Sequence, residues 1–111
     1  MCLYKVLEYL TADGFSPYSK WCATLDVQTR VRIDTAVERF HGGNLGDHKS
    51  VGAGVIETRI HTGPGFRVYY GRDGDELVIL LAGGSKKTQP KDVDAARDRW
   101  KDYKDRKRRG C

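Results

Sequence analysis

The sequence predicts an α+β fold, a single compact domain in which a mostly antiparallel twisted sheet packs against helices. Three strand-like segments follow one another after residue 54, and segments with helical spacing lie on either side of them. The chain has 111 residues, which fits one domain, since two would leave neither half with an adequate core. The expected element order is β-α-α-β-β-β-α.

The first half of the chain is predicted to hold one strand and two helices. Residues 3–10 alternate loosely, as in a strand. Ser16-Pro17 is typical of a helix start, because serine caps the first turn and proline fits its first position. Asp26 is the expected N-cap of a second helix that ends near His41. The buried stripe of that helix is predicted to be Ile33, Ala36, Val37 and Phe40. The glycine-rich segment 44–54 is expected to be a loop.

The second half is predicted to supply most of the sheet and the last helix. Segments 55–61 and 66–72 alternate between the two faces and are joined by the turn Thr62-Gly63-Pro64-Gly65. Residues 77–82 are apolar on both faces, which predicts a central strand covered on both sides. Pro90 is expected to open the last helix. Its predicted core stripe is Val93, Ala96, Trp100 and Tyr103.

Basic residues are concentrated in two parts of the chain, whose formal net charge is +5. Residues 48–91 hold seven basic and four acidic residues, and residues 101–109 hold six basic and two acidic ones. Such clustering favours a polyanionic partner more than a high pI alone does. For the terminal segment, a solvated tail that aids solubility is the alternative. We expect a domain over 1–104 and a basic tail over 105–111.

Several protein classes are disfavoured. No segment has the ~18 consecutive apolar residues of a transmembrane helix, and the first residues lack the features of a signal peptide. A cytoplasmic protein without membrane contact is therefore expected. Three scattered cysteines argue against a disulfide framework. His48 and His61 have no other ligand at a suitable spacing, so no metal and no cofactor is expected.

The hairpin formed by residues 55–72 supplies the candidate site. One face is apolar enough to pack on helices, with Ile56, Thr58, Ile60, Phe66, Val68 and Tyr70. The other face is expected to be open and to present Glu57, Arg59, His61, Arg67 and Tyr69. Unpaired guanidinium groups are costly to bury but bind phosphate through paired hydrogen bonds, and a tyrosine can stack on an RNA base. The alternative is a cross-strand ion pair between Glu57 and one arginine. Lys86 and Lys87 either extend this basic surface or are solvated loop lysines.

The middle of the chain resembles a known family. The matching segments are Asn44-Leu45-Gly46-Asp47-His48-Lys49-Ser50-Val51-Gly52, Glu57-Thr58-Arg59-Ile60, Gly63-Pro64-Gly65-Phe66-Arg67-Val68-Tyr69-Tyr70, Leu80-Leu81-Ala82-Gly83-Gly84-Ser85-Lys86-Lys87-Thr88-Gln89, and Asp92 through Trp100. Together they resemble the addiction-module killer protein group of the RelE/HigB-like toxin superfamily, over roughly residues 26–104.

The resemblance implies a toxin of a type II toxin–antitoxin system, held inactive by a co-expressed antitoxin, often a helix-turn-helix protein of the HigA-like branch. RelE-type members cleave mRNA in the ribosomal decoding site. Basic residues of their strands bind phosphates and stabilise charge there while the 2′-hydroxyl attacks the adjacent phosphorus. By position, Arg59 and Arg67 match such residues, and Lys86 or Lys87 matches a basic residue after the last strand.

The sequence departs from the RelE pattern at Glu57, where RelE has lysine, and no late tyrosine or histidine stands near Lys87. Other branches use a carboxylate and a histidine for proton transfer, so Glu57 is a candidate general base with His61 or Tyr69 as its partner.

We therefore predict an mRNA interferase, a metal-independent endoribonuclease that acts on the ribosome. Its predicted catalytic residues are Arg59, Arg67, Lys87 and Glu57, and its predicted RNA-binding residues are Lys49, His48, His61, Tyr69 and Lys86. Two alternatives stay open: a toxin of the same fold that inhibits DNA gyrase, and a non-toxic binding module paired with an antitoxin.

Overall fold

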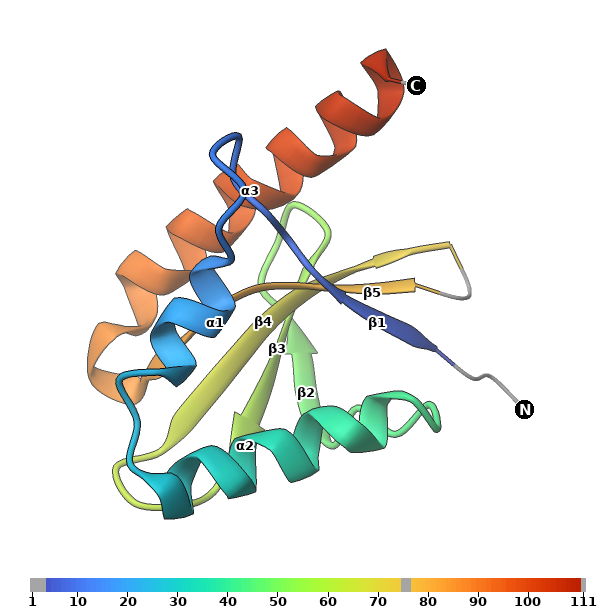
Figure 1. The fold of residues 1–111 in the computed structure, drawn as a ribbon. Coiled ribbons are helices and arrows are strands. Elements are labelled where there is room, and N and C mark those ends of the chain that lie inside the picture. The colour runs from blue at the N-terminus through green and yellow to red at the C-terminus, as the bar shows by residue number, and fades with distance from the viewer. Residues whose placement is uncertain (1–3, 75–76, 111) are drawn as a thin grey trace.

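A computed structural model describes residues 4–74 and 77–110, and within them five strands form one mixed sheet (Figure 1). The elements are β1 (Lys5–Glu8), α1 (Pro17–Cys22), α2 (Val27–Phe40), β2 (Asp47–Ser50), β3 (Val55–Ile60), β4 (Phe66–Asp73), β5 (Leu77–Ser85), the 3-10 helix η1 (Lys86–Thr88) and α3 (Gln89–Arg109). The predicted α+β class is confirmed. Within the described ranges, none of the helices combines the length and the apolar composition that a membrane-spanning helix needs.

The strands lie in the order β1-β5-β4-β3-β2. β1 runs parallel to β5, and each of the other neighbouring pairs is antiparallel, so the sheet is mostly antiparallel as predicted. The loop 61–65 joins β3 and β4 into the predicted hairpin.

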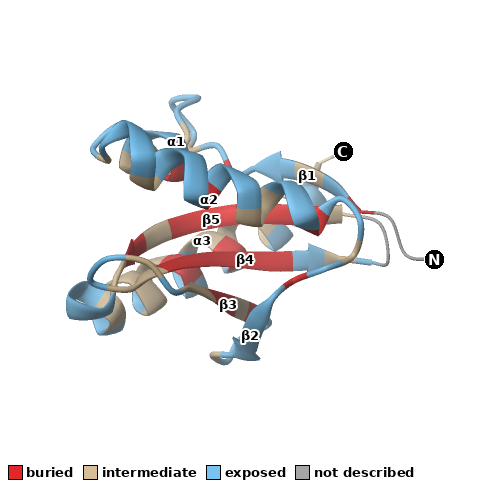
Figure 2. Cartoon of the chain, turned by 90° about the horizontal axis from the view of Figure 1, so that it is seen from below, coloured by how far each residue is buried: buried red, intermediate tan, exposed pale blue. Residues whose placement is uncertain are grey.

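Helices cover both faces of the sheet (Figure 1). The core under α1 and α2 contains Tyr18, Ile33, Phe40, Val68 and Tyr70 among its buried residues. The core under α3 contains Val55, Tyr69, Ala96 and Trp100. Strand β5 contributes Val78 and Leu80 to the first core and Ile79 and Leu81 to the second. The prediction of a strand covered on both sides is therefore confirmed, and Figure 2 shows the buried residues concentrated on β4 and β5.

The helix boundaries follow local signals in the sequence. The Ser16 side chain accepts a hydrogen bond from the Ser19 amide at 3.0 Å, and the Asp26 side chain accepts one from the Thr29 amide at 2.7 Å. Both are N-caps as predicted, since a side-chain oxygen satisfies an amide that has no partner inside the helix. The predicted stripe of α3 is also confirmed, because Ala96 and Trp100 are buried and Val93 and Tyr103 pack beside them.

Two elements differ from the prediction. β2 is a strand at the edge of the sheet where a loop was expected, and all four of its residues are exposed (Figure 2). A strand that is exposed on both faces needs no apolar alternation, and the sequence of β2 has none. Its pairing with β3 is what makes it a strand. Residues 105–109, expected as part of a tail, continue α3. The first strand is shorter than residues 3–10, and Cys2, Leu3 and Cys111 lie outside the described residues.

Candidate nucleic-acid interface

The hairpin face that was expected to be open is covered by α3. Glu57 and Tyr69 are fully buried beneath the helix, and Arg67 is only 8% exposed. The expectation of an open face is wrong at these positions, because Ala96 and Trp100 of α3 pack in the same core as Tyr69. The Arg59 side chain keeps 39% of its surface exposed, and that of His61, in the loop after β3, keeps 72%.

Strand register arranges the polar residues of this face in two adjacent rows. Asp47, Arg59, Arg67 and Gly84 are successive partners across β2, β3, β4 and β5. Lys49, Glu57, Tyr69 and Ala82 form the next row. Register partners point to the same side of a sheet, so one row places two arginines side by side and the other places Glu57 next to them.

The Glu57 carboxylate lies between the two arginines. Its Oε1 is 3.4 Å from Nε of Arg67 and 3.6 Å from Nε of Arg59. Its Oε2 accepts a hydrogen bond of 2.8 Å from the Gln89 side chain, at the start of α3. The alternative of a cross-strand ion pair is thus present between Glu57 and Arg67 of β4, and Glu57 also pairs with Arg59 on its own strand. A buried carboxylate needs such partners, since isolating it from water costs several kcal/mol.

Lys86 and Lys87 stand at the same end of the sheet, in η1. The Lys86 amide donates a 3.0 Å hydrogen bond to the Gly65 carbonyl, which docks η1 against the β3–β4 turn. Both lysines are exposed, and neither has an ion-pair partner within the described part of the chain. We call Arg59, Arg67, Lys86 and Lys87 the cation row. Among residues 4–74 and 77–110, Glu57 is the one carboxylate that forms an ion pair with a member of this row.

The remaining predicted RNA-binding residues fall in different places. Lys49 is exposed on β2 as the register partner of Glu57, on the same side of the sheet as the cation row. His48 pairs with Thr58 and so lies on the opposite side. Nε2 of His61 is 2.7 Å from Asp47 Oδ2, and this hydrogen bond lowers the pKa of the Asp47 carboxyl.

Tyr69 has no exposed ring on which a base could stack in this conformation. Its hydroxyl is buried and has no hydrogen-bond partner among the described residues. Burial, and then the charge of Glu57, raises the pKa of this hydroxyl above its usual range. Tyr69 therefore stays protonated at neutral pH, and its predicted contact with RNA stays a prediction.

Two polar residues of the site were missed by sequence reasoning. Gln89 reaches Glu57 because the first turn of α3 crosses β3, and no periodicity relates residues 32 positions apart. Asp47 was missed because β2 was expected to be a loop, although the pairing of Asp47 with Arg59 follows at once from the strand register.

No group of three or more His, Cys, Asp or Glu side chains in the described ranges is arranged to hold a metal ion. The expected independence from metal stays a prediction.

Comparison with known proteins gives the family. Residues 20–101 match the family described as phage-derived protein Gp49-like (DUF891). The chain belongs to this family. It is a family of toxins from toxin–antitoxin systems. An uncharacterized protein of Haemophilus influenzae (strain ATCC 51907 / DSM 11121 / KW20 / Rd) is 41% identical over 81 residues, which cover 72% of this chain and 82% of the relative. The whole cation row, with Glu57 and Gln89, lies inside the residues that match the family.

Proposed function

We propose that the protein is the toxin of a type II toxin–antitoxin system in the RelE/HigB-like superfamily, and that it stops translation by cleaving mRNA on the ribosome. Membership of the Gp49-like family supports the toxin role. The observation that carries the proposed chemistry is the cation row, in which two arginines share the Glu57 carboxylate and two exposed lysines stand at the same end of the sheet. Such a surface suits a phosphodiester, since fixed cations stabilise the charge that develops on its oxygens.

In the proposed reaction the 2′-oxygen of a ribose forms a bond to the adjacent phosphorus, and the bond from that phosphorus to the 5′-oxygen of the next nucleotide breaks. The proton of the 2′-hydroxyl leaves as the first bond forms, and a proton is delivered to the departing 5′-oxygen. Arg59 contacts the scissile phosphate in this proposal, because its guanidinium is both exposed and held by Glu57. Lys86 and Lys87 bind the flanking phosphates.

Arg67 and Glu57 act from beneath the surface. Burial limits the motion of Arg67, and the carboxylate of Glu57 orients both guanidinium groups. Groups fixed in this way need little reorganisation during the reaction. We therefore propose that Glu57 is a positioning residue. Proton transfer by Glu57 with His61 or Tyr69 requires α3 to move off the sheet, and it stays a prediction.

The proposed partners are mRNA, the ribosome and an antitoxin encoded beside this chain. In the proposal the antitoxin is a helix-turn-helix protein of the HigA-like kind, and the toxin acts in the cytoplasm without a metal or cofactor. A neighbouring reading frame with a helix-turn-helix sequence, whose product restores growth when co-expressed, is the expected result.

The test is primer extension on an mRNA incubated with the purified protein, with and without ribosomes. We expect new RNA ends only when ribosomes are present, and a cleavage rate about 10²–10³ times lower for Arg59→Ala, because that variant removes one preorganised charge from the transition state. Lys101→Ala is the control, since Lys101 is exposed on α3 outside the cation row. Intact mRNA together with inhibited supercoiling by DNA gyrase contradicts the proposal, and so does unimpaired growth of cells that express the protein alone.

A further inference from the structure

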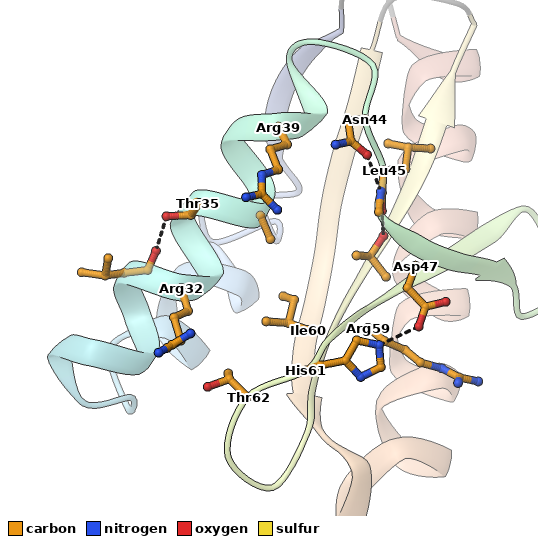
Figure 3. A pocket seen from close by; sticks show the side chains of 14 residues that line it. Arg32, Thr35, Arg39, Asn44, Leu45, Asp47, Arg59, Ile60, His61 and Thr62 are labelled. Carbon is orange, nitrogen blue, oxygen red and sulfur yellow. Dashed lines mark hydrogen bonds and ion pairs between the residues drawn. The ribbon is translucent and has the colours of Figure 1, made fainter.

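We propose that a cleft between α2 and the free edge of β3 binds a nucleotide of the same RNA strand through its phosphate. This inference rests on the proposed function and adds a subsite at the edge of the sheet, between Arg59 of the cation row and α2. The cleft has a volume of about 450 Å³, and its walls come from α2, from the segment 44–47 and from residues 58–62 (Figure 3). Pockets of about 300–1,000 Å³ hold small ligands, so a single nucleotide fits.

The strand register creates this cleft. β2 pairs with β3 only as far as the partners Asp47 and Arg59. Beyond that pair, residues 44–46 are not part of a strand, although the Leu45 carbonyl accepts a 2.8 Å hydrogen bond from the Thr58 hydroxyl, and residues 60–62 have no strand beside them on this edge. The open edge leads from Arg59 in the cation row to the cleft, and Arg59 contributes to both. An RNA strand that leaves the cation row around this edge enters the cleft.

The charges that line the cleft favour an anion. Arg32 and Arg39 stand seven residues apart on α2, which places them two turns apart on one helix face, and Figure 3 shows both side chains directed into the cleft. Neither arginine forms an ion pair with any described residue. Asp47 is the single carboxylate among the lining residues, and it is already hydrogen-bonded to His61. Two guanidinium groups therefore remain free for a phosphate.

The apolar part of the cleft lining suits a nucleobase. It consists of the side chains of Val31, Ala36, Leu45 and Ile60. Asn44 also lines the cleft, and because its Oδ1 accepts a 3.0 Å hydrogen bond from the Gly46 amide, its NH₂ group is the part that can donate to a base. Proteins that read single-stranded RNA place an unstacked base on an apolar or guanidinium surface and bind its edge with such polar groups. An acidic peptide would also match the positive charge of the cleft. We favour RNA because the cleft is continuous with the cation row, which is the proposed RNA-binding surface.

The experiment measures binding of an eight-nucleotide RNA with 2′-O-methyl groups, which cannot be cleaved, by fluorescence anisotropy over a series of salt concentrations. We compare the wild type with R32A/R39A and with R108A/R109A, which removes the same charge from the exposed end of α3. R32A/R39A is expected to bind about tenfold more weakly, a difference of ~1.4 kcal/mol. Its slope of log K against log salt falls by about 0.7, since one phosphate contact to a single strand contributes about that much. R108A/R109A keeps the wild-type slope.

The outcomes separate this inference from the proposed function. Unchanged affinity and slope for R32A/R39A overturn the subsite, while cleavage of mRNA by the wild type still supports the function. Loss of affinity in R32A/R39A supports the subsite even if primer extension finds no cleavage. The same measurement is made with a polyglutamate peptide of equal charge. If this peptide binds the wild type as tightly as the RNA does, and R32A/R39A weakens its binding equally, the cleft recognises an acidic peptide and the inference is overturned.

Discussion

Basic residues at the hairpin end of the sheet and basic residues along α3 have different surroundings. In the cation row, Arg59 and Arg67 share the carboxylate of Glu57, and Lys86 and Lys87 have no ion-pair partner in the described chain. Along α3, by contrast, most arginines are tied individually to the body of the protein. Arg97, Arg99 and Arg106 donate hydrogen bonds to the carbonyls of Val51, Leu81 and Leu10, and Lys107 pairs with Asp73.

This difference shows that total charge alone does not describe where basic side chains remain without an ion-pair partner. The C-terminal segment holds most of the excess positive charge of the sequence, yet several of its cations fasten α3 to strands and loops. The cation row carries fewer charges, but it leaves Arg59, Lys86 and Lys87 accessible at one end of the sheet. The two regions also differ in burial, since Glu57 is fully buried and Asp102 and Asp105 of α3 are more than 40% exposed. Ion pairs in the two regions therefore differ in strength.

The largest expected effect is that of Glu57→Ala. Removal of the carboxylate leaves Arg67 buried without a counter-charge, which lowers the free energy of unfolding by about 3–5 kcal/mol. Urea denaturation followed by circular dichroism measures this loss. Asp105→Ala, which removes an exposed carboxylate from α3, is the control, with an expected loss below ~1 kcal/mol. Equal losses in the two variants contradict the contrast between the regions.

A smaller, pH-dependent effect is expected at Asp73, which anchors the end of α3. Hydrogen bonds from Lys107 and Tyr103 lower the pKa of the Asp73 carboxyl. A carboxyl whose pKa is lower in the folded state adds stability above its unfolded pKa of about 3.9, and this stability disappears as the pH falls through the folded pKa. Asp73→Asn should therefore lower the free energy of unfolding by about 1 kcal/mol at pH 7.

Urea denaturation of the wild type and Asp73→Asn at pH 7, 5, 4 and 3 checks this sign. The difference between the two proteins should stay constant from pH 7 to 5 and shrink toward pH 3. A difference that grows as the pH falls shows that the carboxylate does not stabilise the folded helix.

The smallest effect is expected for Arg108→Ala. This side chain is 78% exposed, and its pair with Asp105 spans 3.5 Å. Exposed pairs of this kind contribute little, so the free energy of unfolding should change by less than ~0.5 kcal/mol. A change in the free energy of unfolding above ~1 kcal/mol, measured by urea denaturation, contradicts the assignment of Arg108 to an exposed ion pair.

The elements that carry their own local signals were predictable from the sequence. The caps Ser16 and Asp26, the apolar stripe of α3 and the two-sided strand β5 all depend on neighbours in the chain. β2 was not predictable, because its four exposed residues show no apolar alternation and its structure depends on pairing with β3.

The covering of the hairpin face also depends on residues far apart in the chain. The alternation in β3 and β4 correctly places Glu57, Arg59, Arg67 and Tyr69 on one face. It does not reveal that α3 lies over that face, because the contact between Gln89 and Glu57 depends on how α3 packs. The two-sided apolar pattern of β5 was the available signal, since a strand buried on both faces requires a helix on each. The catalytic and RNA-binding roles of these residues stay predictions.

The most direct test of the cation row compares two double variants that remove the same charge. K86A/K87A removes the exposed lysines of the row, and K101A/K104A removes two exposed lysines of α3. Inhibition of cell-free protein synthesis by each purified variant is measured over a range of concentrations. K86A/K87A should need an at least about tenfold higher concentration for half inhibition, because two phosphate contacts are lost, while K101A/K104A stays within about twofold of the wild type. Equal loss of inhibition in both variants contradicts the account, because net charge and not the cation row then determines activity.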